Sequence, residues 1–353
     1  MDGWDIKEMI MYKYIIMTTL PIGYNWVDID IKKESELKKL YNFLAENYVE
    51  YQDLYRFKYS TKFLKWALEV PDYIQEWHVS VQKNGEIMGF ISAIPTMVFL
   101  CGKNVPVAEV NFLCVNKKLR KKRLMPVLSK EITRRIANKN FKQSIYTSGY
   151  KIQKPTCQAQ YFHRFINTEK LIDIKFCSIP KLMTMPRMKL LYQIGDNSRL
   201  QKMTKEDIPQ VVKLLNECNA KVFQKFTVKE AEHYFLNRPG IVSSFVLKEN
   251  NTITAFASYY IINASVLNNT KHKNFTTAYL YYHTLVDSSL INDLLVMAKR
   301  DGADVFNALN VYQNKLWLKE LKFKPGDGIL NYFVHVSDGL EDITSKDINL
   351  ILV

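Results

Sequence analysis

Hydrophobic and polar positions along the chain follow two periods, one typical of helices and one typical of strands. Residues 36–46 place Leu37, Leu40 and Leu44 at helical spacing, which predicts an amphipathic helix. Residues 81–92 alternate around a central Asn-Gly pair, which predicts a β-hairpin with a tight turn. The chain therefore contains both kinds of element, and we expect an α/β fold.

The same order of elements occurs twice along the chain. The hairpin at 81–92 resembles residues 246–258, which have one extra residue in the turn. In both places two helices precede the hairpin, and a strand and another helix follow it. The flanking segments are 36–46, 60–68, 108–115 and 125–136 in the first copy, and 208–218, 227–236, 278–286 and 290–299 in the second.

This repeated order resembles the acetyltransferase-type α/β fold, which binds coenzyme A between a central strand and the helix after it. We therefore expect two fused acetyltransferase-like halves related by internal duplication, with mixed sheets flanked by helices. The halves are predicted to meet near residues 180–200, so that residues 1–190 form one unit and residues 191–353 the other.

The charge balance adds a candidate binding loop. Lys and Arg outnumber Asp and Glu by 49 to 35, a formal net charge of +14 that calls for an anionic partner. Nucleic acid, an acidic membrane and a phosphate-bearing cofactor all satisfy that condition. The densest basic run, 117–123, follows the central strand of the first copy, whereas the second copy has Val-Asp-Ser-Ser at 286–289. Taken alone, the run is typical of a solvated patch, but its position predicts one cofactor site, in the N-terminal half.

Cysteine spacing and the N-terminal residues indicate the cellular compartment of the protein. The five cysteines include no CxxC pair, so we expect reduced thiols in a cytoplasmic protein and no metal site. Asp2 and Asp5 replace the basic start of a signal peptide, and Lys13 interrupts the apolar run at 9–17. No apolar stretch reaches the roughly 18 to 20 residues of a membrane span, so none is expected.

Two longer motifs carry a resemblance to a known family. The segment 109–126, Glu-Val-Asn-Phe-Leu-Cys-Val-Asn-Lys-Lys-Leu-Arg-Lys-Lys-Arg-Leu-Met-Pro, closely resembles a signature of the N-myristoyltransferases. The segment 322–328, Lys-Phe-Lys-Pro-Gly-Asp-Gly, is similar to a second signature of that family. The resemblance implies transfer of myristate from myristoyl-CoA to the N-terminal glycine of substrates of the Gly-x-x-x-Ser/Thr type, without a metal.

The resemblance also implies a mechanism. The backbone N–H groups of Phe112 and Leu113 are expected to bind the oxyanion of the tetrahedral intermediate, and the α-carboxylate of Val353 is expected to be the base. Because residues 349–353 are apolar up to the last one, we expect this tail to be buried. Attack by the glycine amine is direct, which leaves Cys114 with a structural role. The implied cofactor-binding residues are Leu113, Cys114, Val115, Arg120, Lys121, Lys122, Arg123, Leu124 and Met125.

The peptide-binding residues come from the resemblance alone. They are Asn111, Tyr48, Phe57, Tyr59, Thr147, Gly149, Tyr161, His163, Tyr279 and Asp327. For His163, a hydrogen-bonding role inside the fold is an equal alternative to direct contact with the substrate. Protein substrates are the expected partners, and we expect a monomer that does not bind nucleic acid.

Two other functions remain as alternatives. The chain could be another acyl-CoA-dependent N-acyltransferase of the same superfamily, acting on lysine or a small amine; the Gly-Asp-Gly motif at 326–328 and the apolar tail argue against it. It could also be a nucleic-acid binder that uses the basic run, with salt-sensitive binding. That second alternative leaves the duplication and the apolar tail unexplained.

Overall fold

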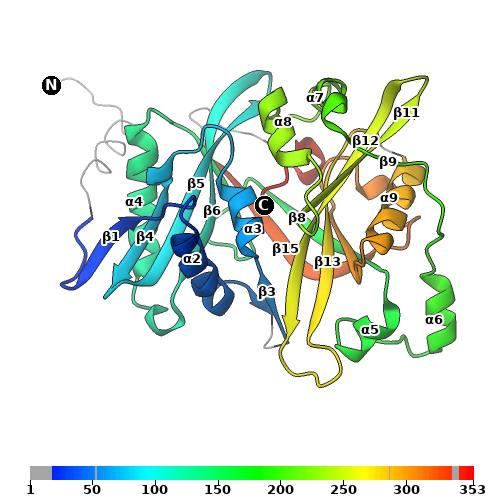
Figure 1. The fold of residues 1–353 in the computed structure, drawn as a ribbon, viewed down its shortest axis with the longest axis horizontal. Helices are drawn as coiled ribbons and strands as arrows, with labels where there is room; N and C mark the ends of the chain where they lie inside the picture. The colour runs from blue at the N-terminus through cyan, green and yellow to red at the C-terminus, as the bar shows by residue number, and fades with distance from the viewer. Residues whose placement is uncertain (1–17, 52–53, 286, 336–341) are drawn as a thin grey trace.

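The computed structural model describes residues 18–51, 54–285, 287–335 and 342–353 (Figure 1). The apolar run at 9–17 and Val286, the last residue of an expected strand, lie outside the described residues.

The predicted duplication is confirmed element by element. Two helices, a hairpin, a strand, a helix and a further strand follow one another in each half. The first half has α2 (Glu34–Asn47), α3 (Thr61–Leu68), β4 (His78–Lys83), β5 (Glu86–Leu100), β6 (Lys103–Val115), α4 (Leu124–Asn138) and β7 (Ser144–Ser148). The second half has α7 (Ile208–Asn216), α8 (Val228–Phe235), β11 (Val242–Glu249), β12 (Thr252–Val266), β13 (Asn274–His283), α9 (Ser288–Arg300) and β14 (Val305–Leu309).

Local chemistry explains why the matching elements begin and turn where they do. The side chains of Ser60 and Thr227 each accept a backbone N–H at the start of α3 and α8, which satisfies a donor that the first helical turn leaves free. In the two hairpin turns Asn84 and Asn250 have φ of 52° and 48°. Asparagine tolerates this left-handed region better than most residues, so both turns close tightly.

The two halves exchange strands and so form one sheet. Strand β8 (Cys157–Phe165) follows β7 in the chain but pairs with β14 of the second half. Conversely, β15 (Lys324–His335) follows β14 but pairs with β7 of the first half, and β8 and β15 also pair with each other. The sheet order is β1-β4-β5-β6-β7-β15-β8-β14-β13-β12-β11-β9. Strands β1 (Tyr24–Asp28) and β9 (Gln201–Lys202) lie at the two ends.

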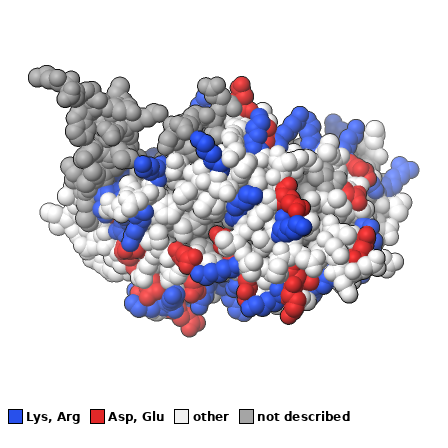
Figure 2. Space-filling model, turned by 90° about the horizontal axis from the view of Figure 1, so that it is seen from above, with Lys and Arg blue, Asp and Glu red and all other residues white. Residues whose placement is uncertain are grey.

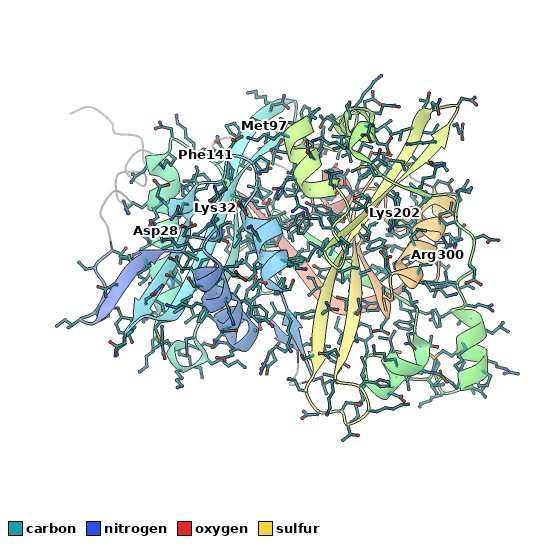
Figure 3. The ribbon with its side chains drawn as sticks, viewed as in Figure 1. Asp28, Lys32, Met97, Phe141, Lys202 and Arg300 are labelled. Atoms are coloured by element: carbon teal, nitrogen blue, oxygen red, sulfur yellow. The ribbon has the colours of Figure 1, made fainter. Side chains whose placement is uncertain are left out.

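Strand pairs other than those of β8 and β15 also join the two halves. β3 (Tyr55–Lys58) pairs with β12 and with β2 (Glu50–Tyr51), and β10 (Val222–Lys225) pairs with the far arm of β5 and with β16 (Ile348–Asn349). Met97, on that arm, lies opposite Lys225, and Figure 3 places it between the two halves. In the same view Asp28 and Phe141 lie on the α4 side of the molecule, and Lys202 and Arg300 lie on the side of the second half.

The remaining elements are short. They are α5 (Thr168–Asp173), α6 (Met185–Leu191) and α10 (Lys315–Leu318), with 3-10 turns η1 (Gln75–Trp77), η2 (Lys117–Leu119), η3 (Lys205–Asp207) and η4 (Ser345–Asp347). Among the helices that the structure describes, none is long and apolar enough to cross a bilayer.

The largest hydrophobic core lies between the halves and includes the end of the chain. Trp66 and Phe90 of the first half pack in the same cluster as Phe235 and Tyr282 of the second half and Leu350 of the tail. The tail is buried as its apolar sequence predicts, and Figure 1 places the C-terminus near the centre of the molecule. The residues of the tail therefore lie where the two halves meet.

We predict that Gly89→Ala destabilises the fold, because the added Cβ would lie 2.9 Å from Leu128 Cδ1 and 3.1 Å from Leu124 Cδ2 where α4 packs on β5. Overpacking of this kind costs about 1–3 kcal/mol of unfolding free energy. Gly195→Ala is the control, since nothing lies within 4 Å of its added Cβ; its effect should stay within about 0.5 kcal/mol. Urea unfolding measures the stability of both variants. Equal midpoints for Gly89→Ala and Gly195→Ala would contradict the prediction.

Candidate active site

A small cavity lies where the tail meets the central strand of the first half. Its volume is about 10 Å³, enough for roughly one water molecule. Asn111, Phe112 and Val353, three residues predicted from the sequence, all line it. The other lining residues are Trp66, Ala67, Leu68, Ser92, Ile94, Glu109, Gln224, Tyr234, Tyr281 and Ile351. An apolar and aromatic wall therefore encloses a few polar groups.

Two tyrosines hold the tail in this place. The Tyr282 hydroxyl accepts the Ile351 N–H at 3.1 Å and donates to Gln224 Oε1 at 3.1 Å. The Tyr332 hydroxyl donates to the Leu350 carbonyl at 2.9 Å. The N–H of Val353 then donates to the carboxyl group of Glu109. These contacts fix the position of the last residue at the cavity.

Glu109 is a site residue that sequence reasoning missed. It is 6% exposed, and burial raises the pKa of its carboxyl group to about 8 from an ordinary 4.5, while the Val353 N–H opposes part of that rise. The group is therefore mostly neutral at neutral pH. A signal existed in the sequence, since Glu109 interrupts the apolar run of Val105, Val107, Ala108 and Val110 in a strand that the duplication makes central.

The strand β6 bulges at the expected oxyanion residues. Its register with β5 shifts between Phe90 and Ser92, which leaves Phe112 and Leu113 opposite a single residue. Phe112 has φ of 53°, a left-handed conformation that is uncommon for a bulky side chain and is kept mainly where the surroundings impose it. Its N–H donates to Asn111 Oδ1 at 2.8 Å.

Aromatic side chains cover the bulge. The rings of Tyr48 and Tyr59 lie 5.8 and 5.6 Å from the ring of Phe112. Burial raises the pKa of both tyrosines well above their ordinary value, so they stay neutral. Burial also raises the pKa of the adjacent Cys114 thiol to about 12. A neutral thiol is a poor nucleophile, which fits a structural role for Cys114.

The basic loop after β6 is anchored by the end of α2. Asn47 Oδ1 accepts the Lys117 N–H at 2.9 Å, and the Asn47 carbonyl accepts from Arg120 Nη2 at 2.6 Å. Lys117 Nζ also pairs with Glu50 at 2.7 Å. Arg123 adopts φ of 59° at the start of α4, which turns the chain into the helix. On the face seen in Figure 2, Lys and Arg alternate with Asp and Glu and form no single continuous patch.

The Gly-Asp-Gly segment packs against the residues predicted to line the peptide groove. A Cβ on Gly326 would lie 2.1 Å from His163 Nε2, and one on Gly328 would lie 3.2 Å from Tyr161. The other ring nitrogen of His163 is 2.6 Å from Asn307 Oδ1. Burial lowers the pKa of His163. His163 thus has the hydrogen-bonding role within the fold that the sequence left as an alternative.

The predicted groove residues form one aromatic group with several outliers. The rings of Tyr161 and Tyr279 lie 6.2 Å apart. Ring contacts through Tyr260 and Phe63 join Tyr279 to Tyr59, and so to the wall over the bulge. Asp327 accepts a hydrogen bond from Tyr51 at 3.4 Å.

The remaining predicted residues lie outside this aromatic group. Thr147 lies opposite Tyr332 between β7 and β15, and Phe57 lies opposite Ala264 between β3 and β12. Gly149 follows β7, and a Cβ added there would meet nothing within 4 Å. Leu113 and Val115 of β6 and Leu124 of α4 pack against the same hydrophobic cluster, whereas Lys121, Lys122 and Met125 are exposed.

Comparison with solved structures identifies the class of fold. A GCN5-related N-acetyltransferase from Anabaena variabilis superposes with a TM-score of 0.50 over 89% of this chain and 73% of its own, at 8% identity. At that identity the likeness shows the fold alone. Together with the duplication, it confirms the expected α/β fold of two acetyltransferase-like halves.

Closer relatives identify the family. Models of the N-terminal and C-terminal domains of myristoyl-CoA:protein N-myristoyltransferase match residues 12–159 and 173–338. Glycylpeptide N-tetradecanoyltransferases from Dictyostelium discoideum and Plasmodium falciparum are 40% and 42% identical, each over 90% of this chain and 80% of their own length. Saccharomyces cerevisiae N-myristoyltransferase with bound myristoyl-CoA superposes with a TM-score of 0.89 at 34% identity, over 95% of this chain and 84% of its own. The chain belongs to the N-myristoyltransferase family and is an acyltransferase.

Glu109→Gln should change how stability depends on pH. Between about pH 4.5 and 8 the folded protein keeps a proton on Glu109 that the unfolded chain has released. Stability of the natural protein therefore falls as pH rises through this window, and Gln removes that loss. The variant should gain stability relative to the natural protein, by at most about 5 kcal/mol above pH 8. Unfolding free energies measured at pH 5 and pH 9 test this, and a constant difference would contradict it.

Proposed function

We propose that this protein transfers myristate from myristoyl-CoA to the N-terminal glycine amine of protein substrates. The observation that carries the proposal is the cavity where the bulged strand at Phe112, the buried carboxyl group of Glu109 and the end of the tail at Val353 come together. Its relatives bear the name of this activity, and the Saccharomyces enzyme has been solved with myristoyl-CoA bound. The fold, the site and the family all agree with the proposed reaction.

The cofactor is assigned to the loop between β6 and α4. The first N–H groups of α4 point out of the helix without partners inside it and attract phosphate oxygens. Arg120, Lys121, Lys122 and Arg123 are exposed around that end and would add charge-assisted hydrogen bonds. Leu113, Cys114, Val115, Leu124 and Met125 would contact the rest of the cofactor. Asn47 holds the loop in shape from α2.

The bulge and the tail would supply the chemistry. The N–H groups of Phe112 and Leu113 stabilise the oxyanion that forms on the thioester carbonyl. Since the Phe112 N–H donates to Asn111 in this structure, that side chain has to release it when the thioester arrives. The α-carboxylate of Val353 accepts one proton from the glycine ammonium, whose pKa is about 7.7 to 8.0 in solution.

The bonds and protons of this reaction balance. The freed amine attacks the thioester carbonyl carbon, a C–N bond forms and the C–S bond breaks. A second proton from the attacking nitrogen goes to the sulfur, so the products are the amide and coenzyme A thiol. We assign the selection of glycine to the enclosure of the reacting carbon by the wall of the cavity, where a side chain on the attacking residue would clash.

The substrate peptide would occupy a groove between the halves. We assign its walls to Tyr48, Phe57, Tyr59, Asn111, Thr147, Gly149, Tyr161, Tyr279 and Asp327, with His163 supporting the wall from behind. In this assignment residues 1–190 bind the cofactor and supply seven of these nine wall residues, and residues 191–353 supply Tyr279, Asp327 and the C-terminal tail. We further propose that the protein acts as a cytoplasmic monomer on substrates of the Gly-x-x-x-Ser/Thr type.

The first test is coenzyme A release from myristoyl-CoA with a Gly-x-x-x-Ser peptide, beside a peptide that begins with Ala. We expect release with glycine and at least a hundredfold less with alanine, because the extra methyl group overlaps the cavity wall. An acetyl-CoA arm separates this activity from that of an acetyltransferase. Comparable release with either peptide, or from acetyl-CoA alone, would refute the proposal.

The second test moves the terminal carboxylate. Adding several residues after Val353 should reduce the single-turnover rate at least tenfold while myristoyl-CoA binding is retained, because the loop at 120–125 is untouched. A matched extension at the N-terminus should have no effect. An unchanged rate after the C-terminal extension would mean that another group accepts the proton.

Gly326→Ala tests the groove. Its Cβ would lie 2.1 Å from His163 Nε2, so the ring or the loop has to move. We expect the KM for the peptide to rise at least tenfold, with myristoyl-CoA binding unchanged. Gly328→Ala is the milder comparison at 3.2 Å from Tyr161. Equal KM values for Gly326→Ala and the natural enzyme would contradict this assignment.

A further inference from the structure

Two carboxyl groups face the same small cavity. Glu109 extends from the middle of β6, and the main-chain carboxyl group of Val353 comes from the end of the tail. The Val353 N–H donates to the Glu109 carboxyl group. The two carboxyl groups are therefore neighbours at one wall of the cavity.

Two negative charges this close together in a buried site would cost much free energy. Burial already raises the pKa of Glu109 to about 8, and each charge further disfavours the other. The titratable side chains that face Glu109 are Tyr234 of α8, Tyr281 and Tyr282 of β13 and Tyr332 of β15, and the carboxylate of Val353 lines the same cavity in the proposed site. Burial raises the pKa of all four tyrosines, so they stay neutral at neutral pH and no positive charge from them can offset the carboxylates.

We propose that Glu109 and the Val353 carboxylate form a pair that shares one proton, in which Glu109 positions the terminal carboxylate and keeps it the charged member. This inference rests on the proposed function. Glu109 acts through Val353 and is a positioning residue: its oxygen fixes the Val353 N–H, and its neutral form leaves one negative charge for the incoming ammonium. Two negative charges would stabilise the ammonium too well and hinder its deprotonation.

The proton count of a turnover follows from this pairing. The pair begins with one proton on Glu109, and the Val353 carboxylate takes a second from the glycine ammonium. The amine then forms the C–N bond, the C–S bond breaks, and the sulfur leaves with the next proton from nitrogen. The pair returns one proton to solvent before the next turnover, so no further reactant is needed.

The test is the pH dependence of the single-turnover rate on enzyme loaded with myristoyl-CoA, from about pH 6 to 9.5. In the natural enzyme we expect the rate to fall as pH rises above about 8, when Glu109 loses its proton. Glu109→Gln keeps a neutral group whose oxygen can accept the Val353 N–H, so it should abolish the alkaline fall and leave the KM for myristoyl-CoA unchanged, whereas Glu109→Ala should lower the rate at least tenfold at pH 7. Glu109→Asp should restore the fall.

Asp293→Asn is the matched control. Asp293 is a buried acid on α9 that pairs with Arg199 at 2.7 Å and lies outside the cavity. The pH profile of Asp293→Asn should therefore match that of the natural enzyme. If Glu109→Gln lowers the rate equally at every pH, Glu109 has only a structural role and the proposal is wrong. Failure of the proposed function is recognised separately, because the natural enzyme would then release no coenzyme A with a glycine peptide.

A second measurement does not depend on activity. Carbon-13 NMR of the full chain follows the Glu109 carboxyl carbon, assigned by its absence in Glu109→Gln. Because burial already raises the pKa of Glu109 to about 8, we expect it to titrate above pH 8, and nearer pH 8 once residues added after Val353 displace the neighbouring carboxylate. Titration in the ordinary glutamate range, or an unchanged value after the extension, would overturn the proposal.

Discussion

Each half of the sheet depends on a strand that the other half supplies. β8 leaves the first half to pair with β14, and β15 leaves the second half to pair with β7. Because backbone donors and acceptors in a buried sheet need partners, neither half can complete its hydrogen bonding alone. This reciprocal pairing holds the two copies in one orientation. It also places their largest shared core, and the tail within that core, between them.

The geometry of the candidate active site follows from that arrangement. Glu109 and the bulge at Phe112 belong to the first half, whereas Tyr282 and Tyr332, which hold the tail, come from β13 and β15 of the second. The two copies have specialised differently at equivalent places. β12 and β13 repeat the register shift of β5 and β6, but there a tyrosine hydroxyl anchors the tail, and no basic run follows the strand. One copy has the bulge to which we assign the oxyanion site, and the equivalent bulge of the other copy supports the end of the chain.

Local features could be predicted from the sequence, and non-local ones could not. Helical spacing, the caps at Ser60 and Thr227 and the Asn turns depend on neighbouring residues, so the duplicated elements were found with small boundary errors. The partners of β8 and β15 depend on which strand edges remain free after the rest has folded, and no short pattern encodes that. The tail residues were predicted because they are apolar and because the family motifs drew attention to them. Glu109 was missed because a single acid in a strand usually faces solvent. Its place within an apolar run was the one signal in the sequence, and the three-dimensional pairing puts it beside Val353.

The strand exchange also determines when the sheet can be completed during synthesis of the chain. β7 is complete by residue 148, but its partner β15 ends at residue 335. At about 5–20 residues per second the ribosome needs roughly 10–40 s to deliver the missing strand. During that interval the first half has an unpaired sheet edge, which is a site for association with other chains. Completion of the sheet is therefore a late event of biosynthesis, and nascent chains of this protein should be clients for chaperones that cover exposed strand edges.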